Sequence, residues 1–551
     1  MSILRIGRGS GLTVAFALIV GCSSDSQAPT PHPADGGPDV ALPPLGSGGA
    51  GAGGMPATMS SGGRTMTQVP GKDATPSLDA GSGGATGGAD SGADADTSGP
   101  PLFSFAWQRS YGQSYAAHVE ADAMGAAIVS GTIFDTKDVQ LGIYALASHG
   151  GADVMLSRIA ASGAINWART YGGTADDYPV SFVLRSDDQI DLVGLYNGTG
   201  NIGGPAFPAF AGTPTRFDVY VAGLTAVGDH RWSHAITSTE EAFAGPGLAL
   251  DATNGLLVPG SFLGTTTITG AGSASKGSWD AFYARYGEPA GDVSASVTLG
   301  AAGDDRASQV VFMGADVLLL GHFQGTVTFP TTPPTTLTSA GGTDVFVARM
   351  TTAGVMTSAV AFGGTGDEDV SRARLDSNGN VVLGGVFSSP SLSILGGPPL
   401  TSAGGKDAFV ATLSPALEHR WSVSFGGDGD DYLRDLATGP AGLIAITGEF
   451  RDTITFGKKR WTAARGDAAT SDVDFFVATL GERGAITWSN AGGGPSTDRG
   501  LGVAIDHNGG IYVTASFMSP IGFGGDVLSP DPGQFGSALV RYTHSGSPNG
   551  N

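Results

Sequence analysis

The sequence predicts an all-β fold, a seven-bladed β-propeller of four-stranded blades, and three observations lead to this prediction. A motif of the type Asp-(Ala/Val/Phe)-Phe-Val-Ala recurs through residues 102–551 at intervals of 62 to 67 residues. Each repeat carries the apolar runs and turn signals of four short strands. The first and last strands of the region complement each other, so one repeat is completed from both chain ends. Self-similarity at a fixed period is typical of repeat architectures.

The recurring motif marks one strand of every repeat. It is clearest at Asp344, Asp407 and Asp474. Weaker copies begin at Asp153, Asp218 and Asp280, and Ser537 opens the last one. A tryptophan strand recurs in step at Trp107, Trp167, Trp232, Trp421 and Trp488. A period of about 64 residues divides the 450 residues from 102 to 551 into seven repeats.

Two kinds of turn punctuate the repeats. A Gly-rich and usually acidic turn follows the tryptophan strand, as in Gly426–Asp431. A turn of Asp, Asn and Gly separates two apolar runs, as in Asp376–Asn380 and Asp506–Gly510. Because Gly supplies turn conformations and Asp and Asn hydrogen-bond their own backbone, both segments predict turns between strands.

Each repeat is expected to form four strands. Within residues 371–427 we place them near Ser371–Leu375, Asn380–Phe387, Asp407–Leu413 and Trp421–Phe425, with a long loop between the second and the third. The third strand is apolar on both of its alternating faces. A strand of that kind is buried on both faces, and the radially packed blades of a propeller bury their inner strands in this way.

The two ends of the region predict how the ring closes. Phe103–Tyr111 has the character of a fourth, tryptophan-type strand, but no first three strands precede it. Ser537–Tyr542 has the character of a third strand, and no fourth strand follows it. We therefore expect the two to share one blade, which removes the open edges of the sheet.

The repeat resembles a known family. The pattern Asp-Ala-Phe-Val-Ala…Trp…Phe-Gly-Gly…Asp…Asn-Gly-Asn-Val-Val-Leu-Gly-Gly looks like that of the SBBP family, the bacterial seven-bladed β-propeller repeat. The resemblance covers about four fifths of the chain and is strongest in residues 340–515. It implies the propeller fold and an extracytoplasmic setting. It implies no activity, because the family has no catalytic residues to carry over.

Residues 1–21 have the features of a secretory signal peptide. Arg5 and Arg8 precede an apolar run from Leu12 to Val20, which is too short to span a bilayer. The run ends at Cys22 in a sequence that resembles a bacterial lipobox, and Cys22 is the only cysteine of the chain. We expect lipidation of Cys22 as the only membrane contact, since several acyl chains anchor a protein stably. Ser23 at the next position indicates the outer membrane.

Residues 22–101 are expected to form a disordered tether. They contain no Phe, Tyr or Trp and consist mostly of Gly, Ser, Ala, Pro, Thr and Asp. Such a segment cannot bury enough apolar area to offset its ordering entropy. The propeller domain is therefore expected to span residues 102–551.

Composition and motifs exclude several classes of function. The net charge of −22 argues against nucleic-acid binding, which needs clustered Lys and Arg. A single cysteine excludes a disulfide framework and a multi-Cys metal site. No His pair has metal-ligand spacing, and no G-x-S-x-G element supports a serine nucleophile. We expect no enzymatic activity and no cofactor.

The acidic turns form the candidate binding site. Their paired carboxylates are Asp176 and Asp177, Asp304 and Asp305, Asp367 and Asp369, and Asp430 and Asp431. In a propeller these turns share one rim with the long loops 324–343 and 388–406, and loops on a rigid scaffold commonly carry function. Carboxylates also favour Ca²⁺, with Asp428, Asp430 and Asp431 as its candidate ligands. Hydrogen bonding of each Asp to its own turn is the alternative explanation.

The expected function is binding at the cell surface. The chain is interpreted as a lipid-anchored envelope protein whose propeller binds a protein or a glycan, and as a monomer. A structural component of envelope assembly is one alternative. An enzyme of the lyase or quinoprotein type that uses the central channel is another.

Overall fold

The computed structural model describes residues 102–134, 139–209, 216–268, 272–464, 473–481, 483–532 and 534–544. The predicted signal peptide, the tether and Cys22 lie outside these residues. No helix within the described ranges is both long and apolar enough to cross a membrane.

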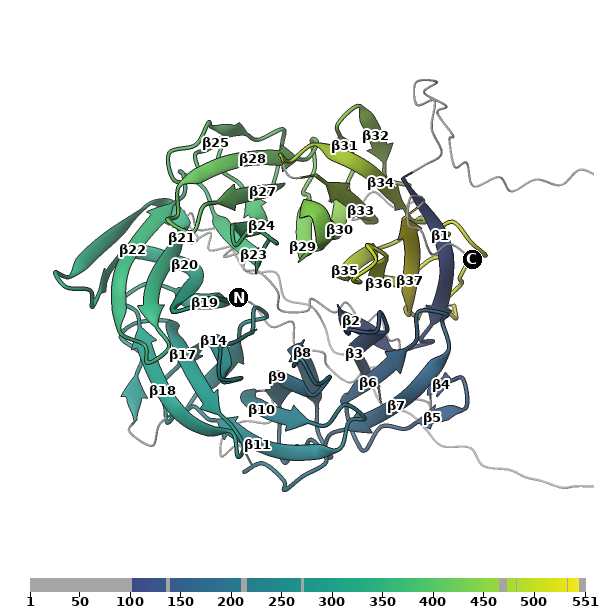
Figure 1. Ribbon diagram of the computed structural model, residues 1–551, viewed down its shortest axis with the longest axis horizontal. Helices are drawn as coiled ribbons and strands as arrows, with labels where there is room; N and C mark the ends of the chain where they lie inside the picture. The colour runs from purple at the N-terminus through teal and green to yellow at the C-terminus, as the bar shows by residue number, and fades with distance from the viewer. Residues whose placement is uncertain are drawn as a thin grey trace, which may run out of the picture. The chain divides into compact units, whose positions relative to one another are not determined.

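Seven antiparallel sheets stand around a central axis, which confirms the predicted seven-bladed β-propeller (Figure 1). Strands are lettered A to D from the axis outward. Blade 1 contains β2 (Tyr115–Ala121), β3 (Ala127–Ile133), β6 (Asp153–Ile159) and β7 (Ile165–Tyr171). Blade 2 contains β8 (Asp177–Leu184), β9 (Ile190–Tyr196), β10 (Asp218–Leu224) and β11 (His230–Ile236). Blade 3 contains β12 (Glu241–Ala244) and β13 (Ala249–Leu250) as a divided strand A, followed by β14 (Leu256–Leu263), β17 (Asp280–Gly287) and β18 (Asp292–Leu299).

The remaining blades follow the same order. Blade 4 contains β19 (Asp305–Met313), β20 (Asp316–Phe329), β21 (Thr335–Thr351) and β22 (Met356–Phe362). Blade 5 contains β23 (Glu368–Leu375), β24 (Val381–Phe387), β27 (Asp407–Leu413) and β28 (His419–Phe425). Blade 6 contains β29 (Tyr432–Thr438), β30 (Ile444–Arg451), β33 (Val473–Leu480) and β34 (Ile486–Gly492), with the 3-10 helix η1 (Pro440–Gly442) between its strands A and B. Blade 7 contains β35 (Asp498–Ile505), β36 (Ile511–Phe517), β37 (Gly536–His544) and β1 (Phe103–Ser110).

The four strands expected in residues 371–427 are all present in blade 5. Strand C has the predicted bounds, Asp407–Leu413, and every one of its residues is buried. Strand A begins three residues earlier than expected, at Glu368, and strand D two residues earlier, at His419. Radial packing therefore buries both faces of the motif strand, as its apolar pattern indicated.

The two chain ends meet in blade 7. Strand β1 pairs antiparallel with β37, from Phe103 opposite His544 to Ser110 opposite Ala538. The N-terminal strand thus supplies strand D of the blade whose first three strands come from the C-terminal end. Because this pairing joins the first and last strands of the propeller, each of its seven blades is complete.

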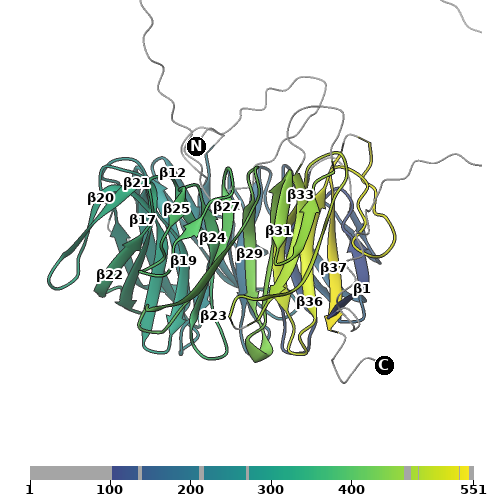
Figure 2. The same cartoon turned by 90° about the horizontal axis from the view of Figure 1, so that it is seen from above.

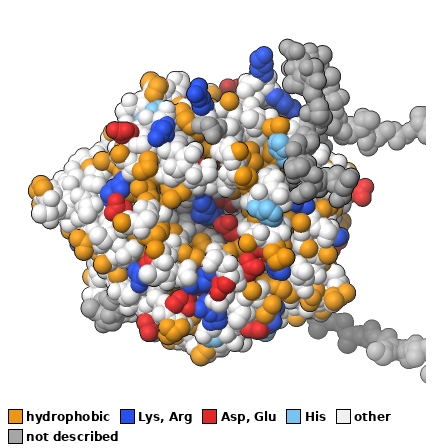
Figure 3. Space-filling model, viewed as in Figure 1, with side chains coloured by type: hydrophobic (Ala, Val, Ile, Leu, Met, Phe, Trp, Pro, Cys, Tyr) orange, Lys and Arg blue, Asp and Glu red, His pale blue; other side chains and the backbone are white. Residues whose placement is uncertain are grey.

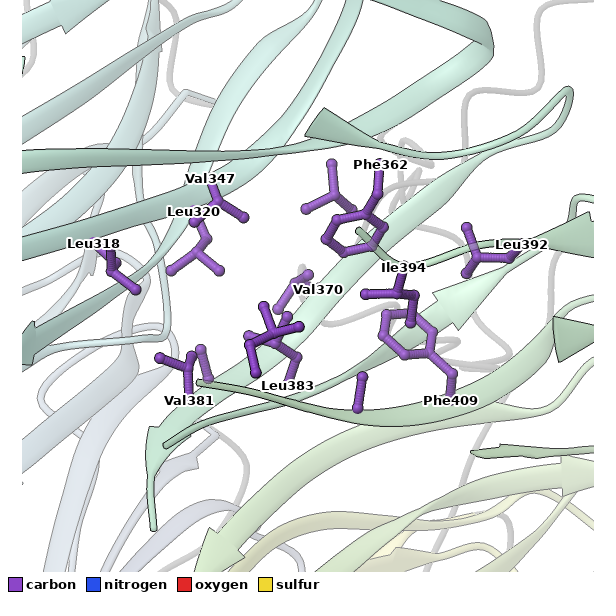
Figure 4. Packing of buried hydrophobic residues seen from close by; sticks show 14 of the residues in the cluster. Leu318, Leu320, Val347, Phe362, Val370, Val381, Leu383, Leu392, Ile394 and Phe409 are labelled. Carbon is purple, nitrogen blue, oxygen red and sulfur yellow. The ribbon is translucent and has the colours of Figure 1, made fainter. Parts of the chain in front are cut away.

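One hydrophobic cluster fills the space between each pair of neighbouring blades. Figure 4 shows the cluster between blades 4 and 5, where Leu320 and Val347 face Val370 and Leu383. Six further clusters lie at the other blade boundaries. The core is therefore divided into seven wedges, and each wedge joins two consecutive repeats.

The long B-to-C connections differ from the predicted loops. Several fold into small hairpins: β4 (Val139–Leu141) with β5 (Tyr144–Leu146), β15 (Thr265–Thr266) with β16 (Ser273–Ala274), β25 (Ser391–Leu392) with β26 (Leu400–Thr401), and β31 (Thr453–Phe456) with β32 (Lys459–Thr462). In blade 4, strands β20 and β21 themselves continue through most of residues 324–343 and project from the ring (Figure 2). Alternating apolar residues such as Leu392 and Ile394 turn inward and seal the groove between blades.

Strand A carries a β-bulge at the same place in six blades. The register shifts at Ala116/His118, Pro179/Ser181, Ala307/Gln309, Val370/Arg372, Leu433/Asp435 and Gly500/Gly502. In blade 3 the segment Gly245–Gly247 divides the strand at the corresponding point. Because bulges redirect side chains, this feature determines which residues meet at the axis.

Candidate functional site

The acidic turns lie on one rim together with the B-to-C connections. The amide of Asn197 donates to the carbonyl of Asp176 at 2.9 Å, and the amide of Ser388 donates to that of Asp367 at 2.9 Å. We call this the upper rim. Its position agrees with the strand order, in which D-to-A and B-to-C connections leave the blades at the same end.

The first carboxylate of each acidic turn accepts a hydrogen bond that links this turn to a B-to-C connection. Asp176 accepts a hydrogen bond from the Ala152 amide at 2.9 Å, and Asp430 accepts one from the Lys406 amide at 3.0 Å. Asp367 and Asp304 make the equivalent contacts with the amides of Thr343 and Trp279, at 3.0 and 3.5 Å. These carboxylates therefore support the fold through backbone groups.

The second carboxylate of each turn is buried at the start of strand A. Asp177, Asp305 and Asp431 each accept a hydrogen bond from the amide four residues earlier, at 2.6, 2.6 and 2.8 Å. In blade 5 the equivalent residue is Glu368, which accepts from the Gly364 amide at 2.6 Å. The sequence prediction paired Asp367 with Asp369, but Asp369 lies one position later and contacts His322 Nδ1 at 3.2 Å.

The buried carboxyl of strand A lies beside the motif Asp of the preceding blade. An ideal Cβ on Gly426 would stand 1.6 Å from Asp407 Oδ1 and 3.1 Å from Asp431 Oδ2. A Cβ on Gly172 would meet Asp153 and Asp177 in the same way, at 1.7 and 2.9 Å. We call these contacts interblade carboxyl pairs. They explain why Gly must precede the acidic part of the turn.

Burial controls the protonation of these pairs. Burial, reinforced by the neighbouring Asp407, raises the pKa of Asp431 to about 8, and Asp177 is raised to about 7 by burial and by Asp153. This shift favours the protonated form of Asp431 near neutral pH. Asp407 Oδ1 is buried and accepts no hydrogen bond from any described donor, so it is the natural acceptor for that proton.

The calcium hypothesis receives no geometric support from these turns. The described residues contain no group of three or more His, Cys, Asp or Glu side chains arranged to hold a metal ion. Asp430 and Asp431 accept hydrogen bonds from backbone amides, and Asp428 is exposed. A calcium site at Asp428, Asp430 and Asp431 stays a prediction.

A charged network crosses the middle of the central channel. From blade 5, Arg372 donates to Asp435 Oδ1 at 2.5 Å, to the Pro246 carbonyl at 2.6 Å and to His118 Nδ1 at 3.2 Å. Although burial alone would raise it, the Arg372 guanidinium holds the pKa of Asp435 well below its usual range. These contacts join blades 1, 3, 5 and 6 across the axis.

A second pair extends this network. Arg374 Nη2 donates to Glu120 Oε1 at 2.8 Å, and His118 Nε2 lies 3.3 Å from the same oxygen. Because Arg372 can only donate to Nδ1, the His118 proton belongs on Nε2, facing Glu120. Together with Arg372 and Asp435 these side chains form the central network. Figure 3 shows basic and acidic side chains together at the centre of the ring.

Above this network a group of non-repeating residues lines the upper mouth of the channel. Arg434 Nη2 donates to Glu449 Oε1, and Arg499 Nε contacts Glu449 Oε2 at 2.9 Å. The Arg434 guanidinium lies over the Tyr432 ring, 4.9 Å from its centroid. Burial raises the pKa of Tyr115, and Arg499 and Arg434 oppose this shift, so the Tyr115 hydroxyl lies within the field of both guanidinium groups. We call these five residues the channel-mouth cluster.

The cluster is accessible although it is deep. Side-chain exposure is 20% for Arg434 and 28% for Arg499, but only 3% for Glu449. Its residues come from β29 and β30 of blade 6, β35 of blade 7 and β2 of blade 1. Four of the five residues therefore lie near the start of a strand A, and Glu449 lies on strand B of blade 6, opposite Tyr432.

The sequence prediction missed this cluster, although a signal for it exists. In six blades the position after the buried strand A opener is occupied by Tyr115, Tyr178, Arg306, Asp369, Tyr432 and Arg499. The opener is acidic in five of these six blades, and the next residue is Tyr in three, Arg in two and Asp in one. A recurring Tyr or Arg directly after the opener is the signal that could have pointed to the cluster.

A groove between blades 5 and 6 is the second candidate. Its volume is about 450 Å³, and β28, the β31 hairpin and the turn Gly484–Ile486 line it. Its buried carboxylate is Asp407, a member of an interblade carboxyl pair. The rest of the lining is mainly apolar or Gly, with the hydroxyls of Thr401, Ser424 and Thr455 as its other polar side chains. Asp407, the only acidic residue that lines this groove, is therefore part of a contact between blades that recurs along the repeat.

Comparison with known proteins yields one distant relative by sequence. No family model matches the chain. Over 358 residues, 61% of this chain, the sequence is 24% identical to the regulatory protein FlaEY of Caulobacter vibrioides. The match spans 37% of the length of that protein.

Several solved structures align with the chain at low similarity. A quinohemoprotein alcohol dehydrogenase of Pseudomonas putida HK5 is 11% identical with a TM-score of 0.34, covering 82% of this chain and 77% of its own. An ulvan lyase is 10% identical with a TM-score of 0.39, covering 77% and 96%. Sqt1 of Chaetomium thermophilum is 11% identical with a TM-score of 0.36, covering 80% and 100%. Likeness of this degree carries no argument about function.

Proposed function

We propose that this protein is a non-catalytic binding module of the cell envelope and that its ligand binds at the upper mouth of the channel. The observation that carries this proposal is the channel-mouth cluster. Two guanidinium groups and two tyrosine rings from three blades converge there. Loops and strand ends on a rigid scaffold are where binding residues concentrate.

The other conspicuous features of the upper rim have structural roles. The acidic turns hold backbone amides and interblade carboxyl pairs, and the B-to-C segment with Leu392, Ile394 and Leu400 packs into the core between blades 4 and 5. A binding role for Asp176, Asp304, Asp367 and Asp430 would compete with these contacts. We therefore place the ligand at the channel mouth and not at the acidic turns.

Export and anchoring complete the proposal. The signal peptide features, the lipobox at Cys22 and the SBBP-like repeats support a lipid-anchored protein on the outer membrane or the cell surface, with a protein or glycan partner there. Cys22→Ser is expected to move the protein out of the membrane fraction. Unchanged membrane retention of the variant would contradict the anchor.

The binding site is tested with the full chain. Wild type and Arg434→Gln/Arg499→Gln are compared against immobilised oligosaccharides and peptides of defined composition, and Arg169→Gln is the control. Arg169 lies on β7 of blade 1, where it pairs with Asp229 on an exposed surface at 2.9 Å. Loss of binding in the double variant alone supports the site. Equal binding by all three proteins places the ligand elsewhere, and turnover of a bound oligosaccharide favours an enzyme.

A further inference from the structure

We infer that the groove between blades 5 and 6 binds an extended acidic peptide of a partner protein, which adds as a strand to the open edge of β28. The groove lies on the outer side of the ring, apart from the channel mouth, so its test is independent of the proposed function. Three features of the groove lead to this ligand: unpaired strand edges, a lining of small side chains, and cations gathered at one end.

Two strands with an unpaired edge border the groove. Within the described part of the chain, β28 pairs only with β27, as the outermost strand of blade 5, and β31 pairs only with β32. Strands β28 and β31 lie side by side at the outer side of the ring (Figure 1). Such edges keep backbone N–H and C=O groups available, and an extended peptide can pair with them. A peptide backbone carries the complementary groups at the same spacing, whereas a saccharide does not.

The size of the groove suits a short extended segment. Its wall follows β28 from Val423 to Gly426, and four residues of a strand span roughly 14 Å. Its volume of about 450 Å³ lies within the usual range of ligand pockets, roughly 300–1,000 Å³. At the upper rim its two walls meet, because an ideal Cβ on Gly427 would lie 1.9 Å from the Thr453 carbonyl oxygen. From there the groove extends toward the turn Gly484–Ile486.

The lining is small, apolar or neutral. Besides glycines, its members are Val423, Phe425, Ala403, Ala485 and Ile486, the hydroxyl residues Thr401, Ser424 and Thr455, and Asp407. Asp407 is buried, and burial raises the pKa of its carboxyl, which favours the neutral form. Asp407 therefore adds little repulsion toward an acidic peptide.

Two cations adjoin the groove at the end away from the acidic turn. Gly457, in the turn of the β31–β32 hairpin, lines this end, and Lys458 follows it in the chain. Gly484, just before β34, lines the same end, and Arg483 precedes it. Both cations are exposed. An anionic side chain of a bound peptide can therefore meet a cation from either wall.

Three further exposed cations lie on the bordering strands. Arg420 belongs to β28, and Lys459 and Arg460 belong to β32. Lys458, Lys459 and Arg460 are the only adjacent Lys or Arg residues in a chain of net charge −22. Among the described residues, none of these five cations forms an ion pair with a carboxylate. This local excess of positive charge favours an acidic ligand.

The basic hairpin is held in place before any peptide arrives. Ile454 and Phe456 of β31 are buried in the hydrophobic cluster between blades 5 and 6. Trp461 Nε1 donates to Ser489 Oγ of β34 at 3.2 Å, and Lys459 Nζ lies 3.7 Å from the centroid of the Trp461 ring. A wall that is already ordered reduces the entropy lost on binding.

The test uses peptides that each differ in one property. Binding of the full chain to the labelled peptide Glu-Glu-Glu-Val-Thr-Val-Thr-Val is measured by fluorescence anisotropy. It is compared with the same peptide carrying Gln in place of Glu, with a form whose last five amides are N-methylated, and with an oligogalacturonate. We expect the Glu peptide to bind at least about tenfold more tightly than the Gln peptide, with affinity falling as salt rises. N-methylation should weaken binding by a similar factor, because it removes the backbone donors that pair with a strand edge.

Two variants locate the peptide in the groove. Lys458→Gln/Arg483→Gln removes the adjoining cations, and Thr455→Trp fills the groove from an exposed position on β31. Each should weaken binding of the Glu peptide at least about tenfold at an unchanged melting temperature. The control Arg169→Gln/Lys276→Gln removes two cations of blades 1 and 3 and should bind like wild type.

Several results would overturn the inference. Equal binding of the Glu and Gln peptides would remove the role of charge, and undiminished binding of the N-methylated peptide would remove the added strand. Tighter binding of the oligogalacturonate would replace the peptide by a saccharide. A dimer of the full chain in sedimentation that Thr455→Trp separates would put a second copy in the groove. Absence of peptide binding by wild type also overturns the inference.

Discussion

At the scale of single residues, the Gly-Gly-acid turn is explained by a contact between blades. Gly426 leaves room for the carboxyls of Asp407 and Asp431, which come from consecutive repeats. The same arrangement recurs at Gly172 with Asp153 and Asp177. The recurring acids therefore reflect packing between blades, and this is why recurrence was a better guide to structure than to binding.

Replacing the crowded glycine tests this interpretation. Gly426→Ala places a Cβ 1.6 Å from Asp407 Oδ1, so the carboxyl pair has to move apart. We expect a loss of about 1–3 kcal/mol in the free energy of unfolding, as for overpacked cores. Gly492→Ala is the matched control, because its Cβ would meet no atom within 4 Å. Equal denaturation midpoints for the two variants would refute the crowding argument.

The same pairs predict how stability depends on pH. The folded pKa of Asp431, about 8, exceeds the usual pKa of an aspartate, 3.8, so the folded state binds the proton more tightly than the unfolded chain. Stability from this group is complete below about pH 4 and is lost as pH rises through 8. Asp431→Asn, which stays neutral, should flatten this decline between pH 5 and 9 in urea denaturation. Asp428→Asn, on the exposed part of the turn, is the control, and an unchanged slope in Asp431→Asn would count against the shared proton.

At the scale of elements, the B-to-C connections are structural parts of the ring. The sequence prediction treated 388–406 as a loop that presents a ligand surface. Leu392, Ile394 and Leu400 of that segment instead belong to the hydrophobic cluster between blades 4 and 5 (Figure 4). An apolar residue at every second position makes such a segment a short strand with one buried face.

Truncating one inward residue of this hairpin tests its role. Ile394→Ala should lower the free energy of unfolding by about 2–5 kcal/mol, because it leaves a cavity between two blades. Ser393→Ala, on the exposed side of the same segment, should change it by less than about 0.5 kcal/mol. Chemical denaturation of both variants decides the matter. An unchanged free energy of unfolding in Ile394→Ala would show that the segment is a loop that does not contribute to the core.

At the scale of the whole molecule, two sets of contacts hold the ring together. Strand β1 completes the last blade by pairing with β37 at the circumference. At the axis, Arg372 of blade 5 contacts groups from blades 1, 3 and 6. The β1–β37 pairing closes the ring, and the contacts of Arg372 fill its centre. The channel mouth therefore lies above a rigid network of side chains.

Deleting the closing strand should be far more damaging than deleting the tether. Removal of residues 102–112 exposes the edge of β37 and takes the buried side chains of Phe103 and Tyr111 out of the core. We expect aggregation or a large drop in melting temperature. Removal of residues 23–95 should leave the melting temperature nearly unchanged, because this segment lacks the aromatic residues of a core. Similar melting temperatures for the two deletions would refute closure as a source of stability.

The sequence by itself determined the blade count, the four strands of each repeat, their burial and the pairing of the two ends. These features are readable because every blade meets the same neighbours and therefore repeats the same residues at the same positions. Only the tertiary structure decided which residues meet at the axis. Arg372 and His118 are 254 residues apart, and the channel-mouth cluster draws on three blades. No local pattern links such residues, because the bulges and the closure of the ring alone bring them together.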